Sequence, residues 1–210
     1  MNMMNPTPWD AVIFDYGGVL SYAPLRREVA ELAVSSGVDE PSFFDLYSNT
    51  RDYYGRSPDE YVQHWLRVAD ALGVKISLSA VESFIGAESE LWVRPNAEVL
   101  GLARAIKAGG LKTAILSNMT FDLLGRLREK LDWLGEFDVQ IWSCEAGRSK
   151  PDPAIYRECL SALGCEAKRA LFLDDRPRNV KAASQVGMEA HVFESAGQAQ
   201  AIAGRGLKLR

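Results

Sequence analysis

Short apolar runs, each followed at once by polar residues, recur along the chain. A continuous apolar run that ends at turn-forming residues is typical of a strand buried on both faces of a sheet. We therefore predict four such strands, and a fifth at residues 190–193. The four runs and the polar residues that follow them are 11–14 before Asp15, 113–116 before Ser117-Asn118, 139–142 before Ser143, and 170–173 before Asp174-Asp175.

Apolar residues at helical spacing fill the intervals between these strands. The predicted helices are residues 97–108, 122–131, 153–163 and 179–186. Glycines stand just beyond the ends of three of them, as is common at helix C-termini. Strands that alternate with helices indicate an α/β fold, a Rossmann-like three-layer core with a parallel sheet. Ligands of such sheets bind beyond the carboxyl ends of the strands, which is where the polar clusters of this chain lie.

The segment from residue 21 to residue 92 breaks this alternation. It contains helical patterns at 24–35, 40–49, 58–72 and 78–91, and no convincing strand. We interpret it as an inserted α-helical domain. We therefore predict two domains: an α/β core of residues 1–20 and 93–210, and a helical domain of residues 21–92.

Composition and charge exclude several classes of protein. With 47% hydrophobic and 25% charged residues, the chain is globular rather than disordered. A net charge of −4 gives no reason to expect binding to nucleic acid. The three cysteines match neither a zinc site nor a redox pair. Without a signal-peptide pattern or a membrane-length apolar run, we expect a cytoplasmic protein that does not bind membranes.

Each polar cluster has an ordinary interpretation when it is taken alone. Asp15 would end a turn, Ser117-Asn118 would cap a helix, and Lys150 would be a solvated surface lysine. Together they are the groups that phosphoryl transfer needs: a carboxylate nucleophile, hydroxyl and amide donors, a cation, and adjacent acids for a hard divalent ion. We therefore expect Asp15, Lys150 and Asp174-Asp175 to meet in one pocket.

The order Asp15-Tyr16-Gly17-Gly18-Val19, Ser117-Asn118, Lys150-Pro151-Asp152-Pro153 and Asp174-Asp175 resembles the haloacid dehalogenase (HAD) superfamily. All four motifs are present in order, and the resemblance spans nearly the whole chain. The helical insertion is similar to the C1 cap of that superfamily. The branch that the motifs resemble most includes glucose-1-phosphatase and the phosphatase domain of epoxide hydrolase.

The resemblance implies a Mg²⁺-dependent phosphatase that acts on a small phosphorylated metabolite through an aspartyl phosphate. Asp15 would be the nucleophile and a metal ligand, and the carbonyl of Gly17 would be a second ligand. Asp175 would complete the metal site, with Asp174 a direct or water-mediated ligand. Lys150 would neutralise the phosphoryl group. Two further residues, Ser117 and Asn118, would bind that group, and Asn179 would orient the acidic loop.

Gly17 departs from the pattern of the phosphatases. Most of them carry a second Asp at this position, which protonates the leaving alkoxide and then activates water, although the glucose-1-phosphatase-like branch also lacks it. Its loss predicts a slower enzyme, by roughly 10²–10⁴-fold, a good leaving group, or a replacement acid from the substrate or the insertion. Candidate replacements from the insertion are Asp52, Asp59, Glu60 and His64. The stretch of residues 51–56 is either a substrate-recognition loop or a packed connection between helices.

Two other functions compete with the phosphatase. A 2-haloacid dehalogenase would not need an acid at position 17, but it would not need the adjacent acids Asp174-Asp175 either. A HAD-like binding or regulatory module with weakened catalysis would explain Gly17 but not the retention of Asp15 and Lys150. The sequence permits a monomer or a homodimer.

Overall fold

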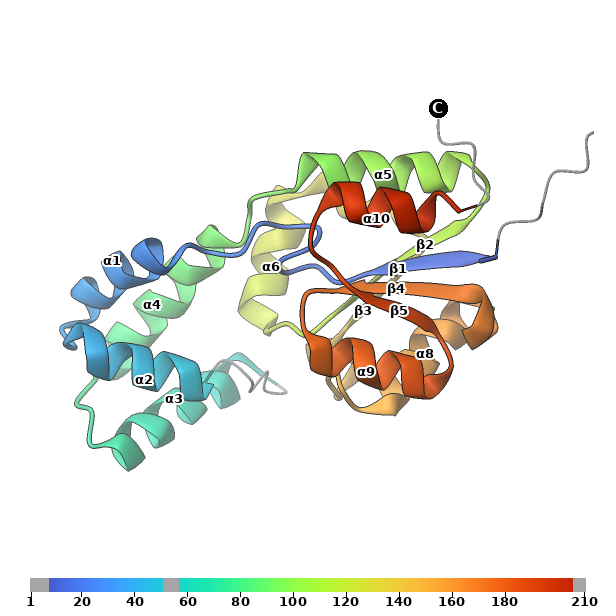
Figure 1. The fold of residues 1–210 in the computed structure, drawn as a ribbon. Coiled ribbons are helices and arrows are strands. Elements are labelled where there is room, and N and C mark those ends of the chain that lie inside the picture. The colour runs from blue at the N-terminus through green and yellow to red at the C-terminus, as the bar shows by residue number, and fades with distance from the viewer. Residues whose placement is uncertain (1–7, 51–56, 206–210) are drawn as a thin grey trace, which may run out of the picture.

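The computed structural model describes residues 8–50 and 57–205. Its centre is a parallel sheet of five strands in the order β3-β2-β1-β4-β5 (Figure 1). The strands are β1 (Ala11–Phe14), β2 (Lys112–Ser117), β3 (Val139–Trp142), β4 (Ala170–Asp174) and β5 (Glu189–Val192). The strand predicted at residues 190–193 thus begins and ends one residue earlier. The predicted α/β fold is confirmed.

Strand β1 is the middle strand, and all four of its residues are fully buried. Its side chains alternate between the two faces of the sheet, as strand geometry requires. Val12 and Phe14 belong to the core on one face, whereas Ala11 and Ile13 belong to the core on the other. A strand covered on both faces needs an unbroken apolar run, which is why the run was visible in the sequence.

Helices cover both faces of the sheet, which makes three layers (Figure 1). One face packs against α5 (Ala97–Ala108), α6 (Phe121–Lys130) and α10 (Ala196–Ala203). The other face packs against α8 (Pro153–Leu163) and α9 (Pro177–Val186). Short elements complete this part of the chain: α7 (Ser143–Ala146), η1 (Asp132–Glu136) and η2 (Ala167–Arg169).

Four helices form a separate group beside the sheet (Figure 1). They are α1 (Arg26–Ser36), α2 (Glu40–Thr50), α3 (Pro58–Leu72) and α4 (Leu78–Leu91). These helices share a hydrophobic core of their own, in which the rings of Phe43 and Phe84 lie 4.9 Å apart and Trp65 is fully buried. Ser57 and Ser77 cap α3 and α4 through their hydroxyl groups, and these caps define where the two helices begin.

Two chain segments lie side by side where the helical group joins the sheet. The backbone N–H of Tyr22 donates to the carbonyl of Arg94 at 2.9 Å. The hydroxyl group of Ser21, which is fully buried, lies 2.5 Å from the carbonyl oxygen of Trp92. These contacts fix the exit and the return of the chain next to the end of β1.

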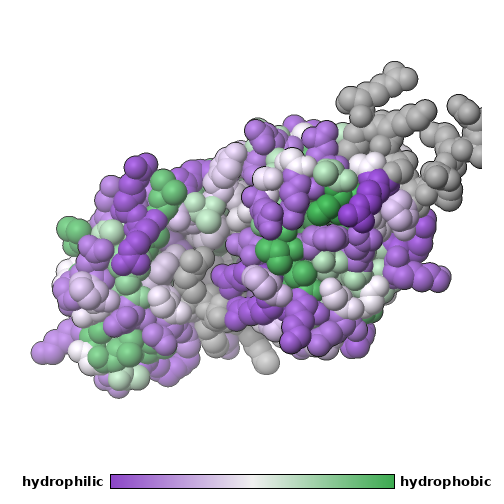
Figure 2. Space-filling view, in the orientation of Figure 1, coloured by the Kyte–Doolittle hydropathy of each residue, from purple (hydrophilic) through white to green (hydrophobic). Residues whose placement is uncertain are grey.

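The face of the molecule in Figure 2 is mostly hydrophilic, with apolar side chains in small groups. Among the described residues, the large hydrophobic side chains that are exposed all lie within residues 21–92: Tyr22, Leu25, Val34, Leu72 and Leu78. In the part of the chain that the structure describes, no helix combines the length and the apolarity that crossing a membrane requires.

Candidate active site

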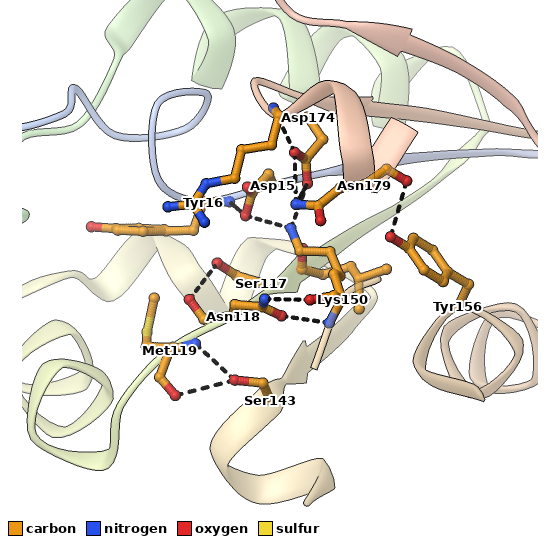
Figure 3. A network of polar contacts seen from close by, with 12 residues as sticks. Asp15, Tyr16, Ser117, Asn118, Met119, Ser143, Lys150, Tyr156, Asp174 and Asn179 are labelled. Carbon is orange, nitrogen blue, oxygen red and sulfur yellow. Dashed lines mark hydrogen bonds and ion pairs between the residues drawn. The ribbon is translucent and has the colours of Figure 1, made fainter. Parts of the chain in front are cut away.

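Three charged side chains meet at the carboxyl end of the sheet (Figure 3). The ammonium Nζ of Lys150 lies 2.9 Å from Asp15 Oδ1 and 2.6 Å from Asp174 Oδ2. It also donates to the carbonyl oxygen of Leu116 at 2.9 Å. The three N–H groups of the lysine therefore have three acceptors, which fixes the position of its charge.

The pairing of the strands brings the two aspartates together. Strands β1 and β4 are parallel neighbours, and Phe14 lies opposite Leu173. Asp15 comes directly after β1, and Asp174 is the last residue of β4. Both carboxylates therefore lie at the same edge of the sheet. The backbone N–H of Asp15 donates to the carbonyl of Leu173 at 2.9 Å, which extends the pairing to this edge.

Lys150 is brought into the site by its own loop and by Asn118. The side-chain amide of Asn118 donates to the carbonyl of Lys150 at 2.9 Å and accepts from its backbone N–H at 2.7 Å. This clamp joins the end of β2 to the loop after α7, and Lys150 is only 2% exposed. Ser117 is also buried at the end of β2, and both Ser117 and Asn118 line the cavity described below.

Burial dominates the electrostatics of Asp15. The pKa of Asp15 is raised to about 7, mainly by the loss of solvent and further by the charges of Asp174 and Asp175. Lys150 opposes the rise through its charge and its hydrogen bond. For Lys150, burial alone would lower the pKa, but the charges of Asp15 and Asp174 raise it. Lys150 therefore stays protonated near neutral pH. Asp15 loses its proton much more readily than Lys150 does, because its pKa is only about 7.

Asp174 is fully buried and hydrogen-bonded on both oxygens. Asn179 Nδ2 lies 3.0 and 3.1 Å from the two oxygens, and the backbone N–H of Arg176 donates to Oδ1 at 2.9 Å. Asn179 is in turn held by the hydroxyl group of Tyr156, which donates to the backbone carbonyl oxygen of Asn179 at 3.0 Å. These contacts fix the acidic loop at the start of α9.

One carboxylate oxygen from each of Asp15, Asp174 and Asp175 lies within 4.8 Å of the others. Asp175 is the exposed member of the three, whereas Asp15 and Asp174 are buried. Lys150 offsets only one of these negative charges, and carboxylate oxygens are the ligands that Mg²⁺ prefers. The donor set therefore fits a hard divalent cation.

A cavity of about 190 Å³ opens from these residues toward the helical group. Core residues such as Asp15, Lys150 and Asp175 line it together with residues of the insertion: Ala23, Tyr61, Ile85, Glu88, Ser89 and Trp92. A side-chain Cβ at Gly17 would lie 3.0 Å from Cζ3 of Trp92. The indole therefore fills the space beside Gly17.

The sequence did not identify Glu88 and Trp92 as site residues. Helical spacing predicts the helix that carries Glu88 but not which side chains of this helix face the core domain. Of the candidate replacement acids, Asp59, Glu60 and His64 are not among the residues that line the cavity. Asp52 and the rest of residues 51–56 lie outside the described residues.

Comparison with known proteins identifies relatives of this chain. The family model of haloacid dehalogenase-like hydrolases matches residues 9–187. The chain is 31% identical over 185 residues to mouse acyl-CoA dehydrogenase family member 10, covering 85% of this chain but only 17% of that protein. It is 27% identical over 196 residues to a phosphorylated carbohydrates phosphatase of Thermotoga maritima, covering 86% of this chain and 82% of the relative.

Solved structures share the fold. A predicted HAD-like hydrolase from Porphyromonas gingivalis superposes with a TM-score of 0.71 at 21% identity, covering 97% of this chain and 100% of that one. A HAD family enzyme from Bacteroides thetaiotaomicron, in complex with magnesium and inorganic phosphate, gives a TM-score of 0.63 at 20% identity. That match covers 89% of this chain and 94% of the other. At these identities the likeness is one of fold.

Proposed function

The chain belongs to the haloacid dehalogenase-like hydrolases, and we propose that it is a cytoplasmic, Mg²⁺-dependent phosphatase of small phosphorylated metabolites. One observation carries the proposal. The carboxylates of Asp15, Asp174 and Asp175 cluster within 4.8 Å, and Lys150 lies 2.9 Å from Asp15. The phosphatase named among the relatives and the neighbour crystallised with magnesium and phosphate support this chemistry.

We assign residues 21–92 to a cap domain over a core of residues 1–20 and 93–210. The separate hydrophobic core of α1–α4 supports this division. So does the cavity, because it is lined from both sides, by Tyr61 and Glu88 of the insertion and by Asp15 and Lys150 of the core. In this arrangement the core carries the reaction and the cap surrounds the part of the substrate that leaves.

Asp15, Asp174, Asp175 and the carbonyl of Gly17 are the groups that would hold Mg²⁺. The bound ion supplies positive charge that offsets the repulsion between the Asp15 carboxylate and the phosphate dianion. Because Asp175 is the exposed acid, it suits direct ligation. Asp174 already accepts hydrogen bonds from Lys150 and Asn179, so we assign it the weaker or water-mediated contact.

The reaction itself would take place at Asp15. An oxygen of its carboxylate attacks phosphorus, the bond from phosphorus to the alcohol oxygen breaks, and the alcohol leaves with a proton. Lys150 neutralises charge on the phosphoryl oxygens, and Ser117 at the end of β2 is placed to bind them. Water then attacks phosphorus of the aspartyl phosphate, which frees Asp15 and releases inorganic phosphate.

Gly17 leaves the alcohol without the usual proton donor. Since the indole of Trp92 fills the adjacent space, a second carboxylate does not fit there without a shift of Trp92. We therefore assign the proton to water or to the substrate rather than to a side chain at position 17, and esters with good leaving groups should react fastest.

A panel of phosphate esters assayed with Mg²⁺ and with a chelator tests the proposal. Phosphate release that the chelator abolishes is the expected result. Halide release from 2-haloacids without metal would identify a dehalogenase instead. If the folded protein hydrolyses none of the esters in the panel, it would be identified as a binding or regulatory module.

Substitution of Gly18 by alanine should weaken the metal site. Gly18 has a φ of +78°, and a Cβ there would lie 2.6 Å from Oδ2 of Asp175. The added methyl group must therefore displace the carboxylate that we assign to the metal. We expect the Mg²⁺ concentration for half-maximal activity to rise about 10–100-fold, the usual range when a ligand loses its support.

Gly110→Ala is the matched control, because Gly110 has a φ of +90° and a Cβ there meets no atom within 4 Å beyond its chain neighbours. Both variants introduce a side chain at positive φ, and this conformation costs about 1–3 kcal/mol. Equal Mg²⁺ requirements in the two variants would show that Asp175 is not a ligand.

Asp15 should make the stability of the metal-free protein depend on pH. Its pKa is about 7 in the folded protein, compared with 3.8 for an aspartate in water. Between these values the folded protein binds the proton and the unfolded chain does not, so stability from this group falls as pH rises from about 4 to about 7. Denaturant unfolding in chelator should show this fall relative to Asp15→Asn. A constant difference between the two proteins across this range would contradict it.

A further inference from the structure

We propose that Glu88 and Trp92 form the subsite for the leaving alcohol, and that they select a small polyhydroxylated alcohol, of the sugar or polyol type. This inference rests on the phosphatase function proposed above. It adds the chemical class of the substrate, which none of the four motifs determines.

Trp92 is a fixed wall of the cavity. Its carbonyl oxygen accepts from the hydroxyl group of Tyr16 at 2.8 Å and from that of Ser21 at 2.5 Å. Its indole Nε1 donates to Glu88 Oε1 at 3.1 Å. Both the backbone and the ring are therefore held, with the opposite edge of the ring against Gly17. An aromatic ring held in this way offers a flat apolar surface to a ligand.

Glu88 is the polar group beside this surface. Its Oε1 accepts two hydrogen bonds, from Trp92 Nε1 and from the hydroxyl group of Tyr47 at 2.6 Å. Among the described residues, no lysine or arginine pairs with Glu88, and no donor binds its second oxygen. The carboxylate is thus oriented by two neutral donors and keeps acceptor capacity, and it lines the cavity.

The position of Glu88 favours recognition over proton transfer. The indole lies between Gly17 and Glu88, because its benzo edge meets Gly17 and its pyrrole N–H meets the carboxylate. Glu88 therefore does not occupy the place of the acid that Gly17 lacks. We place the leaving alcohol in the part of the cavity that Glu88 lines.

A ring face next to a carboxylate selects one kind of alcohol. The carboxylate accepts hydrogen bonds from hydroxyl groups, and the ring packs against the C–H face between them. A second anionic group would be repelled by Glu88, and a bare alkyl chain would offer no donor to the second oxygen of this carboxylate. Arg176 also lines the cavity, but it comes from the loop of Asp174 and Asp175, so we assign it to the phosphoryl end.

The test compares Glu88→Gln with Glu82→Gln, an exposed acid on the same helix that does not line the cavity. The substrates are glucose 6-phosphate, which has many hydroxyl donors, butyl phosphate, which has none, and phosphoglycolate, which has a second anion. For the unaltered protein we expect the highest kcat/KM with glucose 6-phosphate. In Glu88→Gln we expect the ratio of glucose 6-phosphate to butyl phosphate to fall about 10–100-fold. Glu82→Gln should leave this ratio unchanged.

Other results would overturn the proposal. Equal losses with all three esters would mean that Glu88 only supports the fold. A preference of the unaltered protein for butyl phosphate or phosphoglycolate would exclude the polyol class. A Glu88→Gln variant that changes the pH profile, but not the substrate ratio, would make Glu88 a proton donor. If the unaltered protein hydrolyses no phosphate ester, including p-nitrophenyl phosphate, the proposed function itself would be refuted.

Discussion

Replacement of Lys150 with methionine is expected to lower the free energy of unfolding by about 3–5 kcal/mol, the usual cost of removing one partner of a buried ion pair. The side chain of Lys150 is 1% exposed and contacts two carboxylates, Asp15 at 2.9 Å and Asp174 at 2.6 Å. Without the ammonium group, both carboxylates remain buried without a cation. Methionine keeps the length and most of the volume of the side chain, so the loss reports on charge. Denaturant unfolding in chelator at pH 8 measures it.

The pH dependence of this loss identifies its cause. Without Lys150, the pKa of Asp15 should rise further, and the folded variant should take up a proton as the pH falls. The stability deficit should therefore shrink between pH 8 and pH 5. Lys168→Met, whose side chain is 77% exposed beside Glu166, should change stability by less than about 0.5 kcal/mol. A small deficit for Lys150→Met at pH 8 would contradict the buried network.

Replacement of Asp15 with asparagine is expected to abolish phosphate release while the protein remains folded. An amide does not displace an alcohol from phosphorus, and loss of a covalent nucleophile typically costs on the order of 10⁴-fold or more in kcat. The fold should tolerate the change, because burial already disfavours the charged form of Asp15. Lys150 keeps Asp174 and the carbonyl of Leu116 as acceptors. Steady-state kinetics with p-nitrophenyl phosphate and Mg²⁺ measures the loss.

Asp10→Asn is the control for this experiment. Asp10 lies just before β1 and forms an exposed ion pair with Arg169 at 2.6 Å, away from the cavity. Its replacement should leave kcat unchanged. Trapping of a phosphorylated protein, detected by mass after acid quench, should succeed with the unaltered chain and fail with Asp15→Asn. Turnover by Asp15→Asn within tenfold of the unaltered chain would place the nucleophile elsewhere.

Local patterns were sufficient for most of the secondary structure. The predicted helices at residues 58–72, 78–91, 97–108 and 153–163 coincide with α3, α4, α5 and α8. Their signals are local ones, such as the Ser57 and Ser77 caps and the glycines that follow α3 and α8. Helix α10 (Ala196–Ala203) was not predicted, because its alanines, glycine and glutamines carry little amphipathic contrast.

Local patterns were enough to place Asp15 and Asp174-Asp175 at the carboxyl ends of buried strands, and parallel strands have these ends at one edge of the sheet. The packing in three dimensions was needed to show that Lys150 is buried between the aspartates and that Trp92 fills the space beside Gly17. The same packing places Glu88 at the cavity. Strand and helix patterns arise from neighbours along the chain, whereas these contacts join residues tens of positions apart. The contacts of Trp92 and Glu88 depend on how the helical insertion packs against the sheet. The burial of Lys150 depends on how its loop folds over the ends of β1, β2 and β4. No local pattern encodes either arrangement.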